Sequence, residues 1–223
     1  SYAVHDVEIA VSNTVRDLGV MVSSNLRFSD HCAFISKKAS MICGLILRAF
    51  SSRSLQFMVK AFVVYVRPVL EYCSEVWSPS YLSDIERVES VQRNFTRRIV
   101  GLSGCTYVGR LSECKLESLE LRRLKKDLLL VYKMFNGRFN VRFTDFFTVA
   151  YSGSTRGHSL KLYPKLSCTD RALNSFAFRV VNVWNSLPSS VIESSSVNLF
   201  KSRLDAQTDI LLPWLRGRAY KDV

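Results

Sequence analysis

Apolar residues recur every three or four positions along most of the chain after residue 28, which is the spacing of a helix with one buried face. The pattern predicts helices over 29–50, 53–67, 83–99, 118–136, 173–186 and 197–211. Before residue 28 the apolar runs are short, which predicts two strands over 7–11 and 15–22, joined by a turn at 12–14. We therefore expect a mainly α fold: a helical bundle with a short N-terminal β-hairpin and a smaller C-terminal helical part.

Two prolines frame a corner in the first half of the chain. Pro68 has no backbone N–H and crowds the preceding turn, so the apolar helix before it should kink or end there. Pro79 marks a second break. Between the two prolines lie Tyr72 and Trp77, whose large rings we expect to fill a wall of the core.

The helix after the second proline has a predicted cap and a predicted ion pair. Ser83 and Glu86 have the spacing of a capping box, in which each side chain accepts a hydrogen bond from a backbone N–H of the first turn. Glu89 precedes Arg93 by one helical turn, so these two side chains should pair on the helix surface. Both patterns favour structural roles for these carboxylates.

Composition indicates a folded, globular chain. The 223 residues, 48% hydrophobic and 22% charged, are enough to bury a core and are typical of neither disordered nor fibrous proteins. A phenylalanine-rich segment follows Asn136 and Gly137, which suggests a boundary near residue 140. Residues 158–166 alternate weakly and predict either a strand or an extended arm.

The net charge of +12 favours a polyanionic partner, and nucleic acid is favoured over an anionic membrane. Residues 82–139 hold 12 basic and 7 acidic side chains, and this segment contains the strongest predicted helices. The most apolar run, 57–66, is interrupted by Lys60 and is too short to span a bilayer. We therefore expect no membrane anchor.

The cysteines lack the close spacing that zinc sites and dithiols use. Buried free thiols in a reducing, intracellular compartment are the favoured interpretation for Cys32, Cys43, Cys73, Cys105, Cys114 and Cys168. His31 adjoins Cys32, but no further ligand lies nearby in the sequence, so capping or surface packing is favoured over metal binding. No metal site and no catalytic residue is predicted.

Three motifs together carry a resemblance to a known family. They are RPVLEY at 67–72, VWSP at 76–79 and IERVESVQRNFTRRI at 85–99. This combination resembles the region downstream of the catalytic palm in reverse transcriptases of LINE-type (non-LTR, jockey-like) retrotransposons. RDLGV at 16–20 and RVVNVWNSLP at 179–188 resemble further stretches of the same region, so the similarity extends in order over nearly the whole chain.

The resemblance implies a division of the chain and a set of partners. Residues 1–28 would be the hairpin that ends the palm, 29–139 a thumb-like helical region, and 140–223 a C-terminal region with two helices. The partners implied are RNA and DNA, as template and primer, and the missing fingers and palm of the polymerase. Residence in the nucleus and the cytoplasm is likewise implied by the resemblance alone.

The same resemblance implies that this chain alone is not a catalyst. A polymerase holds two Mg²⁺ ions with carboxylates, and the family places an adjacent aspartate pair upstream of the region that this chain resembles. No Asp-Asp pair occurs in the sequence. We expect no cofactor in this chain, because the two Mg²⁺ ions belong to the complete polymerase.

Basic side chains on the predicted thumb-like helices are the candidates for contacting nucleic-acid phosphates. They are Arg93, Arg97, Arg98, Arg122, Lys126 and Lys133. Basic residues in a last helical turn also complement the helix dipole, and a charged ridge is often a solvated face. The alternative function is a co-opted or relic helical protein-interaction module, in which the basic surplus serves solubility.

Overall fold

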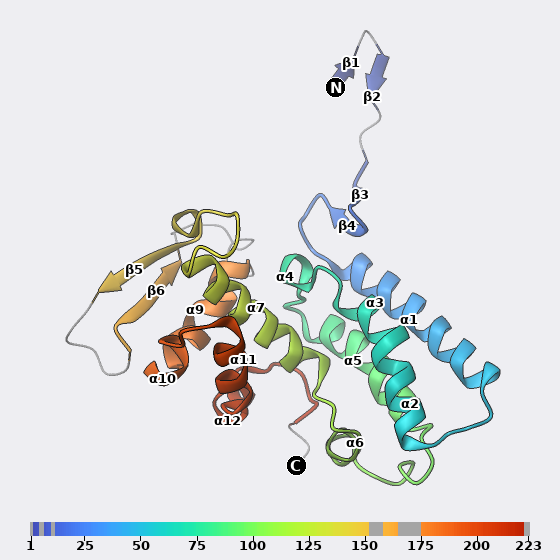
Figure 1. The fold of residues 1–223 in the computed structure, drawn as a ribbon. Coiled ribbons are helices and arrows are strands. Elements are labelled where there is room, and N and C mark those ends of the chain that lie inside the picture. The colour runs from blue at the N-terminus through green and yellow to red at the C-terminus, as the bar shows by residue number, and fades with distance from the viewer. Residues whose placement is uncertain (1, 5–6, 10–11, 152–157, 165–174, 221–223) are drawn as a thin grey trace.

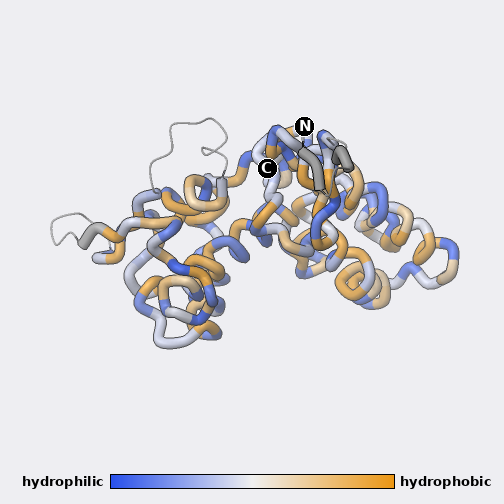
Figure 2. The backbone as a smooth tube through the Cα atoms, turned by 90° about the horizontal axis from the view of Figure 1, so that it is seen from above, coloured by the Kyte–Doolittle hydropathy of each residue, from blue (hydrophilic) through white to orange (hydrophobic). Residues whose placement is uncertain are grey.

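The computed structural model describes residues 2–4, 7–9, 12–151, 158–164 and 175–220. The fold is mainly α-helical, as the sequence predicted. Helices from the first half of the chain gather on one side of α7 (Leu119–Phe135), and the C-terminal elements gather on its other side (Figure 1). Hydrophobic and hydrophilic residues alternate along the helices of both groups (Figure 2), as expected when each helix buries one face.

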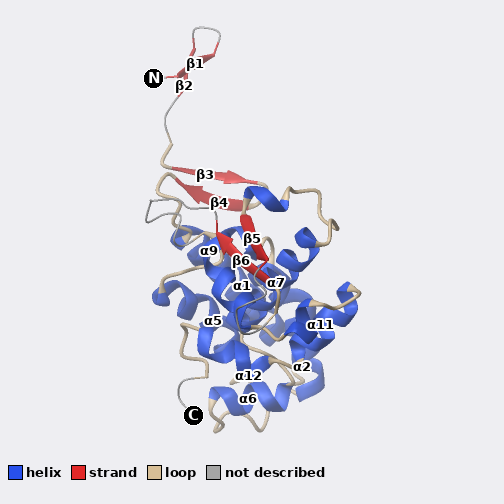
Figure 3. Ribbon diagram, turned by 90° about the vertical axis from the view of Figure 1, so that its left-hand side faces the viewer, coloured by secondary structure: helices blue, strands red, loops and turns tan. Residues whose placement is uncertain are grey.

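The N-terminal segment forms two short antiparallel hairpins instead of the single one predicted. They pair β1 (Tyr2–Val4) with β2 (Val7–Ile9), and β3 (Thr14–Asp17) with β4 (Val20–Ser23). Leu18 and Gly19 have φ angles of 44° and 91°, which makes them the two-residue turn between β3 and β4. The predicted strand 15–22 is therefore folded back on itself at Gly19. Figure 3 shows these strands together at one end of the molecule.

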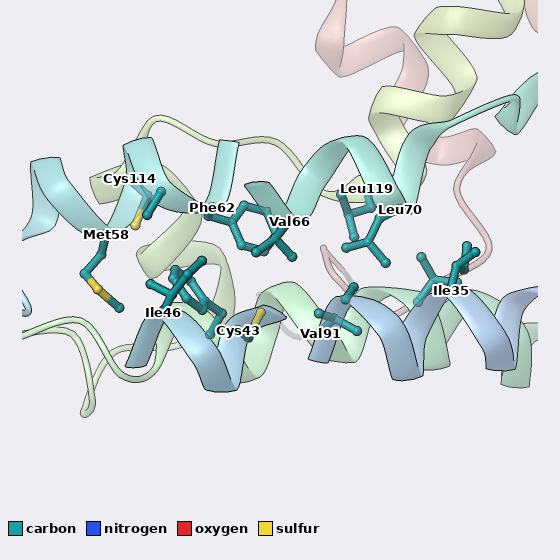
Figure 4. Packing of buried hydrophobic residues seen from close by; sticks show 14 of the residues in the cluster. Ile35, Cys43, Ile46, Met58, Phe62, Val66, Leu70, Val91, Cys114 and Leu119 are labelled. Atoms are coloured by element: carbon teal, nitrogen blue, oxygen red, sulfur yellow. The ribbon is translucent and has the colours of Figure 1, made fainter. Parts of the chain in front are cut away.

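The first half of the chain surrounds one apolar cluster, the first cluster (Figure 4). Its helices are α1 (Ser29–Ala49), α2 (Leu55–Ala61), the π-helical η1 (Phe62–Val66), α3 (Arg67–Glu71), α4 (Ser74–Trp77), α5 (Leu82–Thr96) and α6 (Tyr107–Cys114). Trp77 is fully buried, as predicted. Tyr72 is not part of the core wall: it is 56% exposed, and its hydroxyl donates to the carbonyl of Leu18 in the β3–β4 turn.

The helix before Pro68 does not end at the proline. The N–H of Arg67 bonds to the carbonyl of Phe62, five residues back, so the helix widens into a π segment over one turn. This local widening provides room for the proline ring, which otherwise collides with the preceding turn. The helical path then continues to Glu71.

The predicted capping box of the next helix is not formed. Helix α5 begins at Leu82 after Tyr81 at the cap position, so Ser83 already lies inside the first turn and no side chain caps the helix. Glu86 is therefore available for other partners, and its carboxylate binds Arg93. At α7, in contrast, the Ser118 hydroxyl accepts from the N–H of Leu121 and caps the helix start.

The second half forms its own apolar cluster, the second cluster, against the far side of α7. Its elements are η2 (Phe143–Asp145), β5 (Phe147–Tyr151), β6 (Leu160–Pro164), α9 (Phe176–Ser186), α10 (Ser189–Ile192), α11 (Val197–Asp205), α12 (Thr208–Leu211) and η3 (Leu212–Trp214). Within the described residues, the weak alternation predicted for 158–166 corresponds to strand β6, and β5, which the sequence did not predict, is its partner. The predicted helix 197–211 is interrupted between α11 and α12.

Side chains on α7 and α9 join the two halves of the molecule. Arg179 on α9 binds the Asp127 carboxylate at 2.7 and 3.1 Å and donates to the carbonyl of Glu75 at 2.6 Å. Leu119 belongs to the first cluster and Leu121 to the second, so α7 is shared by both. The division of the chain at residues 28 and 139 stays a prediction.

The cysteines in the described part of the chain are free thiols. Cys32 and Cys43 are buried, and burial raises the pKa of each thiol to about 12. Cys73 is only half-buried, and Cys168 lies outside the described residues. His31 does not pack at the surface as predicted: it is 1% exposed, and its Nδ1 accepts from the N–H of Met21. Within the described ranges, no helix combines the length and apolarity needed to cross a membrane.

Candidate nucleic-acid interface

The six predicted phosphate-binding side chains lie in different settings. Arg97 and Arg98, after the end of α5, are exposed and have no side-chain hydrogen bond or ion pair within the described residues. Lys133 is half-buried in the last turn of α7. Arg93 is partly buried and binds the Glu86 carboxylate at 2.8 Å. The structure therefore leaves Arg97 and Arg98 the most accessible of the six.

Arg122 and Lys126 converge on one buried carboxylate. Glu71 on α3 accepts from Arg122 at 2.5 and 3.2 Å, and Lys126 lies 3.3 Å from the same carboxylate. Burial by itself raises the pKa of Glu71, but the hydrogen bonds and charges of Arg122 and Lys126 outweigh burial and leave that pKa below its ordinary value. This cluster holds α7 against α3, a structural role that the sequence did not predict.

A concave basic surface, the arginine groove, contains two of the predicted residues. It is lined by Glu86, Arg93, Arg97, Cys105, Thr106, Tyr107, Arg110 and Arg218. Four arginines face one glutamate, so three positive charges remain in surplus. Arg97 and Arg218 are exposed. The groove also contains the start of α6, where the Thr106 hydroxyl caps the helix and the dipole adds partial positive charge.

Arg110 is a buried residue in the lining of the arginine groove, and its hydrogen bonds hold α6 against the end of α5. Its guanidinium donates to the Thr96 hydroxyl, to the carbonyl of Cys105 at 2.6 Å and to the carbonyl of Arg93. Burial, together with the charge of Arg97, lowers the pKa of Arg110. The N–H groups of Arg110 already donate to acceptors of the protein, so Arg110 contributes only its charge to the groove. Arg97 is exposed, and its N–H groups are available to a ligand.

Two guanidinium groups lie over the ring of Tyr107 in the same groove. The Arg93 and Arg110 guanidinium carbons are 5.1 and 5.5 Å from the centre of its ring, a cation–π arrangement. Its hydroxyl donates to Glu89, which also accepts from the N–H groups of Leu119 and Glu120. Burial raises the pKa of Glu89 despite these donors. The predicted pairing of Glu89 with Arg93 is therefore wrong, because Glu89 points inward to the start of α7.

The last described residues bring Arg218 to the groove. Glu120 accepts from the N–H groups of Arg216 and Gly217 at 2.8 and 2.9 Å, and Glu86 accepts from the N–H of Arg218 at 2.7 Å. Gly217 allows this close approach, because a Cβ at its position would lie 2.6 Å from an oxygen of Glu120. Two carboxylates thus hold the chain end across α5 and α7.

A second basic concavity, the lysine groove, contains the other predicted pair. Its lining residues are Arg67, Lys115, Leu116, Glu117, Arg122, Lys125, Lys126, Leu129, Lys201, Leu204 and Asp205. Lys125 binds both Glu117 and Asp205, and Arg122 lies 3.9 Å from Glu117, so both acids have cationic partners within the groove. Arg67, Lys115 and Lys201 have no side-chain ion pair among the residues described.

These groups suit recognition of phosphate. Guanidinium forks match phosphate oxygens in geometry and charge, and lysines add point charges. Within the described ranges, no group of three or more His, Cys, Asp or Glu side chains is placed to hold a metal ion. The one carboxylate of the arginine groove, Glu86, is occupied by Arg93 and the chain end.

Sequence reasoning missed Arg110 and Arg218 for different reasons. Arg110 is 4% exposed, and its importance depends on contacts with carbonyl groups that helical periodicity does not reveal. Arg218 reaches the groove through a fold-back of the chain end. Its one local signal is the glycine beside it, Gly217, where another group approaches the backbone closely.

The chain is similar to a protein of a nematode worm. The uncharacterized protein B0403.1 of Caenorhabditis elegans is 27% identical over 136 residues, which cover 60% of this chain and 69% of that protein. No protein-family model matches the chain. No solved structure matches it.

Proposed function

We propose that the chain is the region downstream of the palm of a non-LTR retrotransposon reverse transcriptase, and that it binds template–primer nucleic acid through the phosphates. The observation that carries this proposal is the arginine groove, in which Arg97 and Arg218 present open donors beside Arg93 and Arg110. The resemblance of RPVLEY, VWSP and the α5 motif to that family supports the polymerase assignment.

The groove favours phosphate contacts over base readout. Its donors lie on the ends of α5 and α6 and on the chain end, and none of these elements projects as a long helix or ribbon that could enter a nucleic-acid groove. Contacts of this kind position a duplex without reading its sequence. We therefore expect similar affinity for an RNA–DNA hybrid and for an unrelated DNA duplex.

Binding across a salt series tests the proposal directly. The purified chain is titrated into a labelled RNA–DNA hybrid, and the dissociation constant is measured as the salt concentration rises. Each phosphate contact contributes about one unit to the slope of log affinity against log salt. Replacing Arg97 and Arg218 by alanine should reduce that slope by about two units, because their side chains form no hydrogen bond within the described residues.

A matched variant distinguishes the effect of the arginine groove on binding from the effect of the total net charge. Replacing Lys38 and Arg138 by alanine removes the same number of charges from exposed positions outside both grooves, and neither side chain forms an ion pair among the described residues. Its slope should equal that of the wild type. Equal slopes for the wild type and the Arg97 and Arg218 variant would refute the arginine groove as a binding site, and no binding at low salt would refute nucleic-acid binding altogether.

A second candidate function, a protein-interaction module, draws on exposed apolar side chains of the first half. Met41 and Leu45 on α1 are 63% and 56% exposed, and Val64 and Tyr65 on η1 are 50% and 61% exposed. Clustered exposed apolar groups often mark protein contacts. This candidate is favoured if the salt series shows no binding of nucleic acid.

A further inference from the structure

A cavity of about 350 Å³ lies between the two halves of the molecule. Its walls come from the turn at 78–80, from α7, from α9, and from residues 214–216 after α12. Small-molecule sites commonly have this size and lie between packed units. The cavity is separate from the arginine groove, with which it shares no lining residue.

The cavity wall contains a buried arginine without hydrogen-bond partners. Arg123 is 2% exposed, and its Nε, Nη1 and Nη2 atoms find no acceptor among the described residues. The ring of Trp77 lies 6.0 Å from its guanidinium carbon but offers no oxygen to these donors. Arg123 shares one face of α7 with Glu120, Leu124 and Asp127, and all four line the cavity. Buried donors without acceptors are rare in folded proteins and cost stability, more so when the group is charged.

The nearest carboxylates already have other partners. Asp127 is held by two guanidinium nitrogens of Arg179, and Glu89 accepts from Tyr107 and from the start of α7. Glu120 accepts from the backbone of the chain end. The charge of Arg123 acts to lower the pKa of Asp127 and of Glu89, against the larger effect of burial. None of these acids, however, forms a hydrogen bond with Arg123.

The remaining walls indicate the class of ligand. The lining holds three arginines against two carboxylates, so one positive charge is in surplus. Arg179 and Arg216 are fixed in place, since Arg179 binds Asp127 and Arg216 donates to the carbonyl of Ser80. Phe178 and the partly exposed Trp214 add aromatic surface. These features fit a compact ligand with a single oxyanion group and a flat apolar body.

We infer that this cavity binds a small carboxylate- or phosphate-bearing molecule, with Arg123 as the group that receives the oxyanion. A guanidinium presents paired donors that match the two oxygens of such a group. The ligand would supply the acceptors that Arg123 lacks, and it would also contact both halves of the chain. This inference is independent of nucleic-acid binding, because it involves none of the arginines of that groove.

Thermal denaturation of the full chain with defined anions tests the inference. The probes are benzoate, a carboxylate with a flat apolar body, and inorganic phosphate, each compared with chloride at equal ionic strength. A ligand that binds only the folded state raises the melting temperature with its concentration. We expect a rise for wild type with at least one probe.

Two arginine variants serve as the test and the control. Arg123→Met should abolish the rise, and in chloride it should melt above the wild type, because an unpartnered buried cation is replaced by an apolar side chain of similar length. Arg138→Met, at an exposed position, should respond as the wild type does.

A rise that persists in Arg123→Met overturns the inference, and so does either of two further results. One is the absence of any rise for the wild type with both probes. The other is a lower melting temperature for Arg123→Met in chloride, which would show that Glu89 and Asp127 already stabilise the guanidinium. If the methionine variant does not fold, Arg123→Lys keeps the charge and loses the paired donors, and an undiminished rise in that variant also overturns the inference.

Discussion

The buried carboxylate of Glu71 should contribute strongly to stability, and Glu71→Gln tests this. The side chain of Glu71 is 8% exposed and binds Arg122 and Lys126, whose side chains are 27% and 32% exposed. Removing one partner of a fully buried ion pair costs about 3–5 kcal/mol. Because the two cations can turn partly to water, we expect a loss of about 2–3 kcal/mol. For a chain of this size that corresponds to a fall in melting temperature of about 4–12 °C.

The pH dependence gives the same prediction an independent check. The pKa of Glu71 lies below its ordinary value of 4.5 in the folded protein, since the two cations outweigh burial. Its stabilisation is therefore complete above pH 4.5 and is lost as the pH falls through the folded-state pKa. The stability difference between wild type and Glu71→Gln should be constant near neutral pH and should shrink in acid, because glutamine does not titrate.

Urea denaturation followed by circular dichroism at several pH values measures this difference. Glu113→Gln is the matched control, since Glu113 is exposed on α6 and forms no ion pair among the described residues. It should change stability by less than about 0.5 kcal/mol. The reasoning is refuted if Glu71→Gln is as stable as the wild type at neutral pH, or if the difference persists unchanged in acid.

Three further outcomes follow from the packing. Gly217→Ala should lower stability by about 1–3 kcal/mol in thermal denaturation, because the new Cβ meets Glu120 at 2.6 Å; an unchanged melting temperature would contradict the fold-back of the chain end. Ser118→Ala should cost about 1 kcal/mol through loss of the α7 cap, and Ser112→Ala, at an exposed position, should cost far less. Cys32 and Cys43 should resist alkylation of the native protein at pH 8, since their pKa values are about 12, and should react once denaturant unfolds it; rapid labelling of both in the native state would show that they are not buried.

Helical periodicity was sufficient to predict most of the helices and much of the core. The apolar positions of 29–50 and 118–136 correspond to α1 and α7, and Trp77 is buried as expected. These features depend on spacing within one helix, which a single sequence records directly.

The errors arise where distant contacts override a local pattern. The capping box at Ser83 is absent because α5 begins one residue earlier, at Leu82, and Glu86 binds instead Arg93 and the N–H of Arg218, which is far away in the sequence. Of the two outcomes predicted at Pro68, a kink or an end, the helix does not end: it continues to Glu71 through one π turn that accommodates the ring. The N-terminal strands were paired wrongly because the Leu18–Gly19 turn was treated as part of a strand.

The candidate site shows that a row of basic residues in a sequence is not the same as a basic surface. Arg93, Arg122 and Lys126 form ion pairs with carboxylates of the same chain. Their charges therefore stabilise the fold and are not free to bind an external phosphate. Among the described residues, the cations open to an external polyanion include Arg98 and two separate groups, one in the arginine groove and one in the lysine groove. A phosphate backbone that contacted both would have a salt slope set by these open cations alone, and therefore smaller than the formal charge of the chain suggests.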